Sequence, residues 1–250
     1  MRVICGTYQL HPLAKKIYHA VKAAIRAIIR FSAFILTLRN LYDYVFGWLG
    51  WPPKTLRIHI VVLRSPAGPV LKNIYDLSGA IDHLKQIFKD HCNINVVPYA
   101  SGNKDDLKNW VHVLDDVAPP RSLKDRAGRL GVPAELGEAG DYFAGQMAGW
   151  VGGFMPIRLA FPITIFIVEE VIGAAAIAPL LNDYIVMSAT LNQAADTSIM
   201  SHEVGHRCNL LHFNEKNNLM YYANSREAPY WLHWWQRNLV RVSEHVTYLF

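Results

Sequence analysis

Cysteine is scarce in this chain of 250 residues, which contains only Cys5, Cys92 and Cys208. Three cysteines so widely separated exclude a disulfide framework as the organising feature of the fold. Charged residues are also sparse, at 18%, whereas hydrophobic residues make up 52%. This composition excludes an extensively disordered chain and is typical of a globular protein with an unusually apolar segment. The length suits one large domain or two smaller ones, and no internal repeat is evident.

Acidic residues are almost missing from the first 50 residues, which carry seven Lys or Arg and a single acid, Asp43. The other 200 residues carry 18 basic and 19 acidic side chains, so the net charge of +5 belongs to the N-terminal part. The nearly neutral remainder has no excess of basic residues with which to neutralise phosphates. This excludes nucleic acid as its expected partner.

Residues 1–53 are predicted to form a basic amphipathic helical arm. Three basic residues recur at intervals of four and would form one stripe on a helix: Lys22, Arg26 and Arg30. The arm ends at 51–53, WPP, because proline disfavours helix in the residue before it. Two interpretations stay open for residues 12–50: a surface for a membrane or a protein partner, or a helix packed on its own domain with its basic side chains in water.

The arm lacks the uninterrupted apolar run of about 20 residues that a membrane-spanning helix needs. Arg39 and Asp43 interrupt the apolar window at 31–51, which argues against a simple span. A cleavable signal peptide is also a poor fit, because basic residues precede the apolar part and no clear small-residue cleavage site follows. The sequence therefore leaves the compartment open.

After the arm, the pattern changes to strands alternating with helices. Apolar and β-branched segments predict strands at 55–65, 93–99, 161–170 and 183–189, with a short irregular edge strand within 171–179. Helical spacing predicts helices at 77–91, with Ser78 as N-cap, and at 105–117. The strand–helix–strand order at 55–99 favours a parallel pair. The rest of 101–160 is rich in Gly and Pro and is predicted as a long loop region.

The segment SHEVGHRCNLLHF, residues 201–213, carries the most specific chemistry in the chain. A helix is predicted here, beginning at Asp196 or Thr197. His202 and His206 are four positions apart, so both imidazoles project from one helix face and can reach the same zinc ion. Glu203 lies one step round the helix, where it can act as general base on a zinc-activated water.

His212 follows His206 by six residues, and a straight helix would point it away from the other two histidines. It can complete a metal site only if the chain turns sharply between them. Such a turn needs a residue that tolerates the left-handed conformation, and Asn209 is the best non-glycine choice in this interval. The sequence therefore predicts a Zn²⁺ site at His202, His206 and His212, with a backbone reversal at Asn209.

These residues, H-E-V-G-H-R-C-N-L-L-H, resemble the zinc-binding signature of metzincin peptidases, H-E-x-x-H-x-x-G-x-x-H. Asn209 stands where that family usually has glycine. Metzincins also carry a methionine in a tight turn beneath the zinc, and NNLMYY supplies Met220 with the turn-forming Asn217-Asn218 pair before it. Met220 followed by Tyr222 resembles the Met-x-Tyr turn of astacins and serralysins. In those subfamilies the tyrosine binds zinc or stabilises the oxyanion, a role that the resemblance implies for Tyr222.

The resemblance also implies an α+β fold with a mixed twisted sheet, packed helices, the zinc helix and a small C-terminal helical subdomain. Residues 54–250 would be the catalytic domain, with an upper part at 54–209 and a lower part at 210–250 that ends in a helix at 231–250. The implied activity is zinc-dependent cleavage of peptide bonds in a peptide or protein substrate. The short strand at 171–179 would be the edge along which an extended substrate binds.

Other candidate residues and functions stay open beside this prediction. Glu227 lies 21 residues after His206, near the spacing of the glutamate ligand in thermolysin-like enzymes, but no matching motif surrounds it. Cys208 falls off the ligand face and is expected to be a packed thiol. The basic arm motivates a different class of function, a membrane- or assembly-docking protein with a structural or inactive zinc site. Zinc-dependent hydrolysis of a non-peptide amide is a further alternative.

Overall fold

A computed structural model describes 43, 47–64, 72–99, 103, 105–117, 123–124, 143, 162–169, 171–172, 174–178, 184–189, 197–222 and 226–248. Most of the predicted arm lies outside these residues, as does most of the predicted loop region at 101–160. Among the helices of the described residues, none is both long enough and apolar enough to cross a membrane.

Strand β1 (Lys54–Arg64), predicted from its β-branched residues, pairs with four other strands of the main sheet. β2 (Ile94–Pro98) and β3 (Val111–Val117) pair with it in parallel, one after the other along one side. On the other side lie parallel β5 (Ile163–Val168) and antiparallel β9 (Val246–Thr247). β1 therefore joins segments from both ends of the described chain in one sheet.

The sheet continues beyond β5 through parallel β8 (Tyr184–Ser188) to antiparallel β7 (Ala176–Ile177). Two further short strands, β4 (Leu123–Lys124) and β6 (Val171–Ile172), pair separately. Parallel and antiparallel pairs coexist, so the predicted mixed sheet is confirmed. Both β5 and β8 are buried along their whole length, as their continuous apolar runs indicate.

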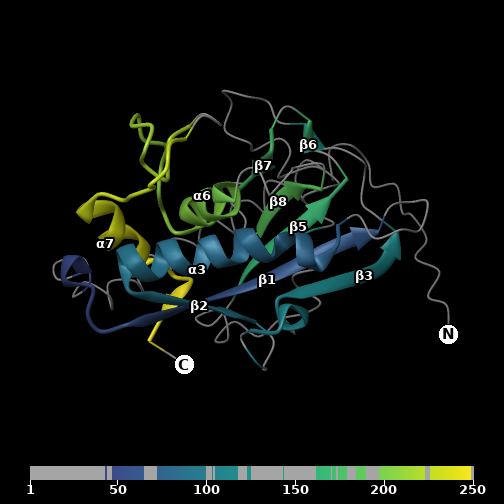
Figure 1. Ribbon diagram of the computed structural model, residues 1–250, viewed down its shortest axis with the longest axis horizontal. Coiled ribbons are helices and arrows are strands. Elements are labelled where there is room, and N and C mark those ends of the chain that lie inside the picture. Colours follow the sequence, from purple (N-terminus) through teal and green to yellow (C-terminus); the bar gives the residue numbers. More distant parts are fainter. Residues whose placement is uncertain are drawn as a thin grey trace, which may run out of the picture.

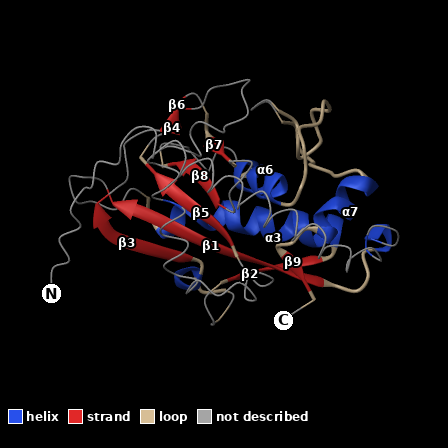
Figure 2. Ribbon diagram, turned by 180° about the vertical axis from the view of Figure 1, so that it is seen from behind, coloured by secondary structure: helices blue, strands red, loops and turns tan. Residues whose placement is uncertain are grey.

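Three α-helices cover one face of this sheet: α3 (Ser78–Cys92), α6 (Ser198–Arg207) and α7 (Trp234–Val242). α3 lies in front of β1 in Figure 1 and behind the strands in Figure 2. The alternate β1 residues Leu56, Ile58, Ile60 and Val62 pack with the apolar faces of the helices into the main core. The opposite β1 residues Val61 and Leu63 belong to a second cluster with Phe143, Phe166 and Tyr184.

The predicted helix at 105–117 is wrong. A 3-10 turn, η4 (Leu107–Asn109), is followed by β3, whose β-branched Val111, Val113 and Val117 favour a strand. The apolar spacing of this short segment fits both periods, and pairing with β1 decides between them.

Two helix ends also differ from the sequence-based expectation. Ser78 is the first residue of α3 and not its N-cap, because the 3-10 turn η3 (Ile74–Leu77) precedes it and its hydroxyl donates to the Tyr75 carbonyl at 2.9 Å. The helix predicted at 231–250 is confined to Trp234–Val242. Ser243 leaves the helical conformation, with φ −55° and ψ 143°, and the chain then forms β9.

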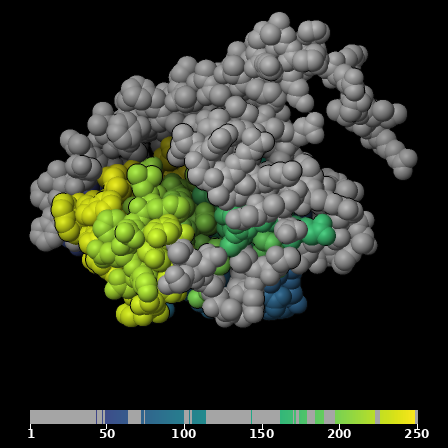
Figure 3. Space-filling view, turned by 90° about the horizontal axis from the view of Figure 1, so that it is seen from above, coloured from purple at the N-terminus to yellow at the C-terminus, as the bar shows by residue number. Residues whose placement is uncertain are grey.

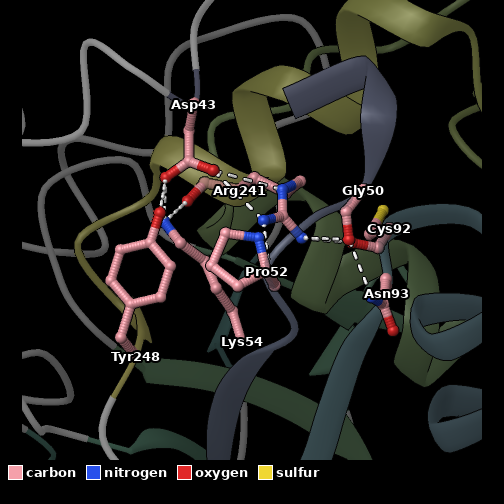
Figure 4. A network of polar contacts seen from close by, with 8 residues as sticks. All are labelled: Asp43, Gly50, Pro52, Lys54, Cys92, Asn93, Arg241 and Tyr248. Carbon is pink, nitrogen blue, oxygen red and sulfur yellow. Dashed lines mark hydrogen bonds and ion pairs between the residues drawn. The ribbon is translucent and has the colours of Figure 1, made fainter. Parts of the chain in front are cut away.

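A buried ionic network ties Asp43 to the body of the protein (Figure 4). The Asp43 carboxylate lies 2.5 Å from the Lys54 ammonium and 3.1 Å from the Arg241 guanidinium, and all three side chains are fully buried. It also accepts a hydrogen bond of 2.5 Å from the Tyr248 hydroxyl. Arg241 donates onward to the Cys92 and Pro52 carbonyls, at 2.8 and 2.6 Å. The network thus connects Asp43 and Pro52 of the predicted arm to β1, α3 and the C-terminal segment.

Candidate metal centre

Helix α6 places His202 and His206 on one face, four residues apart. The helix begins after Thr197, one of the two predicted start residues, and is buried along nearly all of its length. Its first turn packs in the main core through Ile199 and Met200. The two imidazoles therefore project from a helix that the core holds on the sheet.

The chain reverses at Asn209, which has φ +70°. The Asn209 N–H donates to the His206 carbonyl at 3.2 Å, and the Leu210 N–H donates to the Gly205 carbonyl at 3.0 Å. These two bonds are those of a Schellman motif, in which a left-handed residue ends a helix. Asparagine is among the few non-glycine residues that adopt this conformation readily. The turn directs the following segment back toward the face that carries the two histidines.

The reversal brings His212 to His202 and His206. The Nε2 atom of His206 lies 3.2 Å from Nε2 of His202 and 3.2 Å from Nε2 of His212. One ligand atom from each of the three residues lies within 4.8 Å of the others. Two nitrogens bound to one tetrahedral zinc are about 3.3–3.4 Å apart when each Zn–N bond is about 2.0–2.1 Å. The three imidazoles are therefore spaced to hold a single metal ion.

Backbone carbonyls fix which nitrogen of two of these imidazoles carries the proton. Nδ1 of His202 lies 2.8 Å from the Leu219 carbonyl, and Nδ1 of His206 lies 2.8 Å from the Leu210 carbonyl. A carbonyl oxygen only accepts, so both Nδ1 atoms donate and both Nε2 atoms carry lone pairs. Lone pairs that face one another at 3.2 Å repel unless a cation lies between them. A donated Nδ1–H is also the usual outer contact of a metal-binding histidine.

The three imidazoles are held neutral. Burial, and next the neighbouring His206, lower the pKa of His202 to about 3. Burial lowers the pKa of His206 to about 4, and burial followed by the charge of Arg226 lowers the pKa of His212. Neutral imidazole is the form that binds metal.

Burial changes across the centre. His202 is 4% exposed, His206 is partly buried and His212 is exposed, with Leu211 beside it 75% exposed. Within the described residues, no fourth His, Cys, Asp or Glu joins this group. The three histidines could therefore hold a metal ion that is open to solvent on the His212 side.

Glu203, the predicted general base, lies beside His202 on α6 and is 8% exposed. Cys208 is fully buried at the end of the helix, as expected of a packed thiol. Burial raises the pKa of its thiol to about 12, so it stays protonated. Glu227 is exposed and pairs with Lys216 at 3.2 Å, apart from the three histidines.

Met220 lies beneath α6 in a tight turn, closed by a hydrogen bond of 3.0 Å from the Tyr221 N–H to the Asn218 carbonyl. It is fully buried. A Cβ atom placed on Gly205 would lie only 2.6 Å from the Met220 sulfur. The turn therefore packs against α6 at the one helical position without a side chain. Tyr222, two residues on, is 59% exposed and its ring contacts Tyr221.

Arg226 is a neighbour of the centre that sequence reasoning missed. Its Nε donates to the Ser198 hydroxyl at 2.9 Å, one helical turn before His202, and its Nη1 donates to the Tyr221 carbonyl at 3.4 Å. Its charge contributes to the lowered pKa of all three histidines. No motif surrounds Arg226 in the sequence, so no local signal could have identified it.

Comparison with known proteins found no matching family model and no matching curated protein. Among solved structures, the chain is similar to metalloproteinase-II from Bacteroides fragilis, with 14% sequence identity and a TM-score of 0.45. The match covers 76% of this chain and 54% of that one, so this chain spans about half the length of the solved structure.

Proposed function

We propose that this protein is a zinc-dependent peptidase whose ion is held by His202, His206 and His212. One observation carries the proposal: three Nε2 atoms converge, and two of them have lone pairs fixed toward each other by Nδ1–H bonds to carbonyls. This donor set suits zinc, for which imidazole is a common ligand. We further propose that its chemistry is that of the metzincins, because the chain carries the HExxHxxNxxH sequence and the methionine turn.

Bound zinc would act as a Lewis acid and lower the pKa of a water molecule to about 7. Glu203 would act as the general base, accepting a proton from the attacking water and returning it to the leaving amine. Its position next to His202 in α6, where it is only 8% exposed, supports this role. Tyr222 is proposed to donate a hydrogen bond from its hydroxyl to the developing oxyanion.

The sheet edge beside α6 supports a peptide substrate. β7 is the last strand of the main sheet among the described residues, and it runs antiparallel to β8. Arg207 of α6 donates to the Ala178 carbonyl, just after β7, at 3.0 Å. This contact holds the edge close to the helix that carries His202 and His206. An extended peptide that pairs with such an edge would pass the metal centre, which is the proposed binding mode.

The test is Glu203→Gln, with Glu227→Gln as a control for loss of an exposed carboxylate. Cleavage of a peptide library by the zinc-loaded protein should fall by about 10²–10⁴-fold in Glu203→Gln, the usual contribution of a general base. Zinc content, measured by mass spectrometry, should stay at one ion per chain, and Glu227→Gln should cleave like the wild type. Undiminished cleavage by Glu203→Gln would refute the role of Glu203. A wild-type protein that binds no zinc would refute the proposed function.

A further inference from the structure

Asn218 and Gln236 form a buried pair of amides that links α7 to the turn beneath the metal centre. Both residues are completely buried. The Asn218 Nδ2 donates to the Gln236 Oε1 at 2.8 Å, and the Gln236 Nε2 donates back to the Asn218 Oδ1 at 3.3 Å. Reciprocal bonds of this kind set the relative orientation of both side chains.

Two backbone contacts settle which amide atom is oxygen and which is nitrogen. The Asn218 Oδ1 accepts the Met220 N–H at 2.9 Å, and the Gln236 Oε1 accepts the His233 N–H at 2.9 Å. Both oxygens must therefore point as described, since a backbone N–H cannot bond to an amide NH₂. Each amide oxygen accepts one hydrogen bond from a backbone N–H and one from the partner amide. Removing either side chain would therefore leave buried polar atoms without a hydrogen-bond partner.

The turn held by this pair carries the carbonyl that binds His202. Residues Asn218–Tyr221 form the turn, and Leu219 within it accepts the Nδ1–H of His202 at 2.8 Å. The Leu219 N–H is fixed in turn by the Trp231 carbonyl at 3.0 Å. A shift of the turn would move the Leu219 carbonyl away from His202. The His202 ring would then lose the bond that keeps its proton on Nδ1.

We propose that the Asn218–Gln236 pair is a positioning element of the metal centre, acting through the Leu219 carbonyl on the tautomer and orientation of His202. The inference rests on the proposed metal site and adds to it two residues that do not touch the ion. Outer contacts of metal-binding histidines typically contribute 10–100-fold in metal affinity or activity. Through this pair, α7 contributes to the affinity for the metal although it carries no metal ligand.

The experiment compares Gln236→Met with Asn238→Leu. Both substitutions replace a buried amide of α7 by an apolar side chain of similar size, but Asn238 faces Gly47 and not the turn. Zinc affinity, measured by competition with a chromophoric chelator, should fall about 10–100-fold in Gln236→Met and stay within about threefold of wild type in Asn238→Leu. Asn218→Ala is the second variant, and it should weaken zinc binding to a similar extent.

A second measurement reports the mechanism and not merely the stability of the fold. Imidazole ¹⁵N chemical shifts of the metal-free protein should show His202 protonated at Nδ1 in the wild type and in Asn238→Leu, and a mixture of tautomers in Gln236→Met. If the wild type binds zinc and Gln236→Met binds it equally well with an unchanged tautomer, the positioning role is overturned while the proposed function stands. A wild type without zinc affinity would overturn both.

Discussion

Replacing Gly205 by alanine tests whether the Met220 turn is packed directly on α6. The added Cβ would lie 2.6 Å from the Met220 sulfur, 3.3 Å from its Cε and 3.5 Å from Cδ1 of Leu210. The first distance is far shorter than van der Waals contact, and Met220 is fully buried, so the side chain has little room to withdraw. Overpacking of this kind costs about 1–3 kcal/mol.

The same substitution also stabilises the helix, which partly offsets the cost of overpacking. Alanine in a helix interior is about 1 kcal/mol more favourable than glycine. The net effect expected for Gly205→Ala is therefore a loss of about 0–2 kcal/mol. Gly79→Ala in α3 is the matched control, because its Cβ would meet only the Thr197 methyl at 3.4 Å. That variant should gain up to about 1 kcal/mol.

Urea unfolding of the metal-free protein, followed by tryptophan fluorescence, measures both changes. Gly205→Ala should be about 1–3 kcal/mol less stable than Gly79→Ala, the difference expected from overpacking alone. In a Met220→Ala background the clash is removed, so Gly205→Ala should become neutral or stabilising there. If Gly205→Ala stabilises the wild type as much as Gly79→Ala does, the described packing of Met220 on α6 is refuted.

Three further predictions follow from the turn, the ionic network and the histidines. Asn209→Ala should lower the free energy of unfolding by about 1–2 kcal/mol in thermal unfolding, since alanine disfavours φ +70°. Asn209→Gly should leave it unchanged or raise it. Equal changes in stability for the two variants would contradict the left-handed turn. Asp43→Ala should lower the free energy of unfolding in urea by about 3–5 kcal/mol, because it removes the counter-charge of two buried cations. Asp82→Ala, which breaks an exposed ion pair, should lower it by less than about 1 kcal/mol. Similar losses in the two variants would contradict the network. The folded-state pKa values of His202 and His206, about 3 and 4, lie below the unfolded value near 6.5. Below pH 6.5 the unfolded chain therefore binds more protons at these two imidazoles than the folded, metal-free protein does. The stability that the two neutral imidazoles contribute is lost as the pH falls from about 6.5 through 4 and 3. The calorimetric melting temperature of the metal-free protein should therefore fall from pH 7 to pH 5, and it should fall less in His202→Gln; an equal fall in that variant would contradict the lowered pKa of His202.

The candidate centre could be predicted in large part because its geometry is local. The spacing of His202 and His206 places them together on any α-helix, whatever surrounds it. The approach of His212 needs one left-handed residue in a short interval, and Asn209 is the residue there that adopts it.

The features that the sequence did not predict depend on distant contacts. The segment at 105–117 fits both a helix and a strand, and only pairing with β1 selects the strand. The amide of Gln236 binds Asn218 across 18 residues, and Arg226 reaches Ser198 across 28. No periodicity or motif encodes such partners. The same holds for the carbonyl of Leu219, because every residue has one and only the fold determines which of them meets an imidazole.

The placement of β9 has a consequence for how the chain reaches its folded state. β1 is synthesised long before the strand that covers one side of Thr55 and Leu56, because that strand consists of the distant residues Val246 and Thr247. Closing so long a loop is entropically unfavourable and tends to slow folding. Until it closes, part of a strongly apolar strand keeps an open edge, and such edges pair readily with other chains. Production of the protein should therefore benefit from low temperature and slow synthesis, and versions cut short after α7 should accumulate as aggregates.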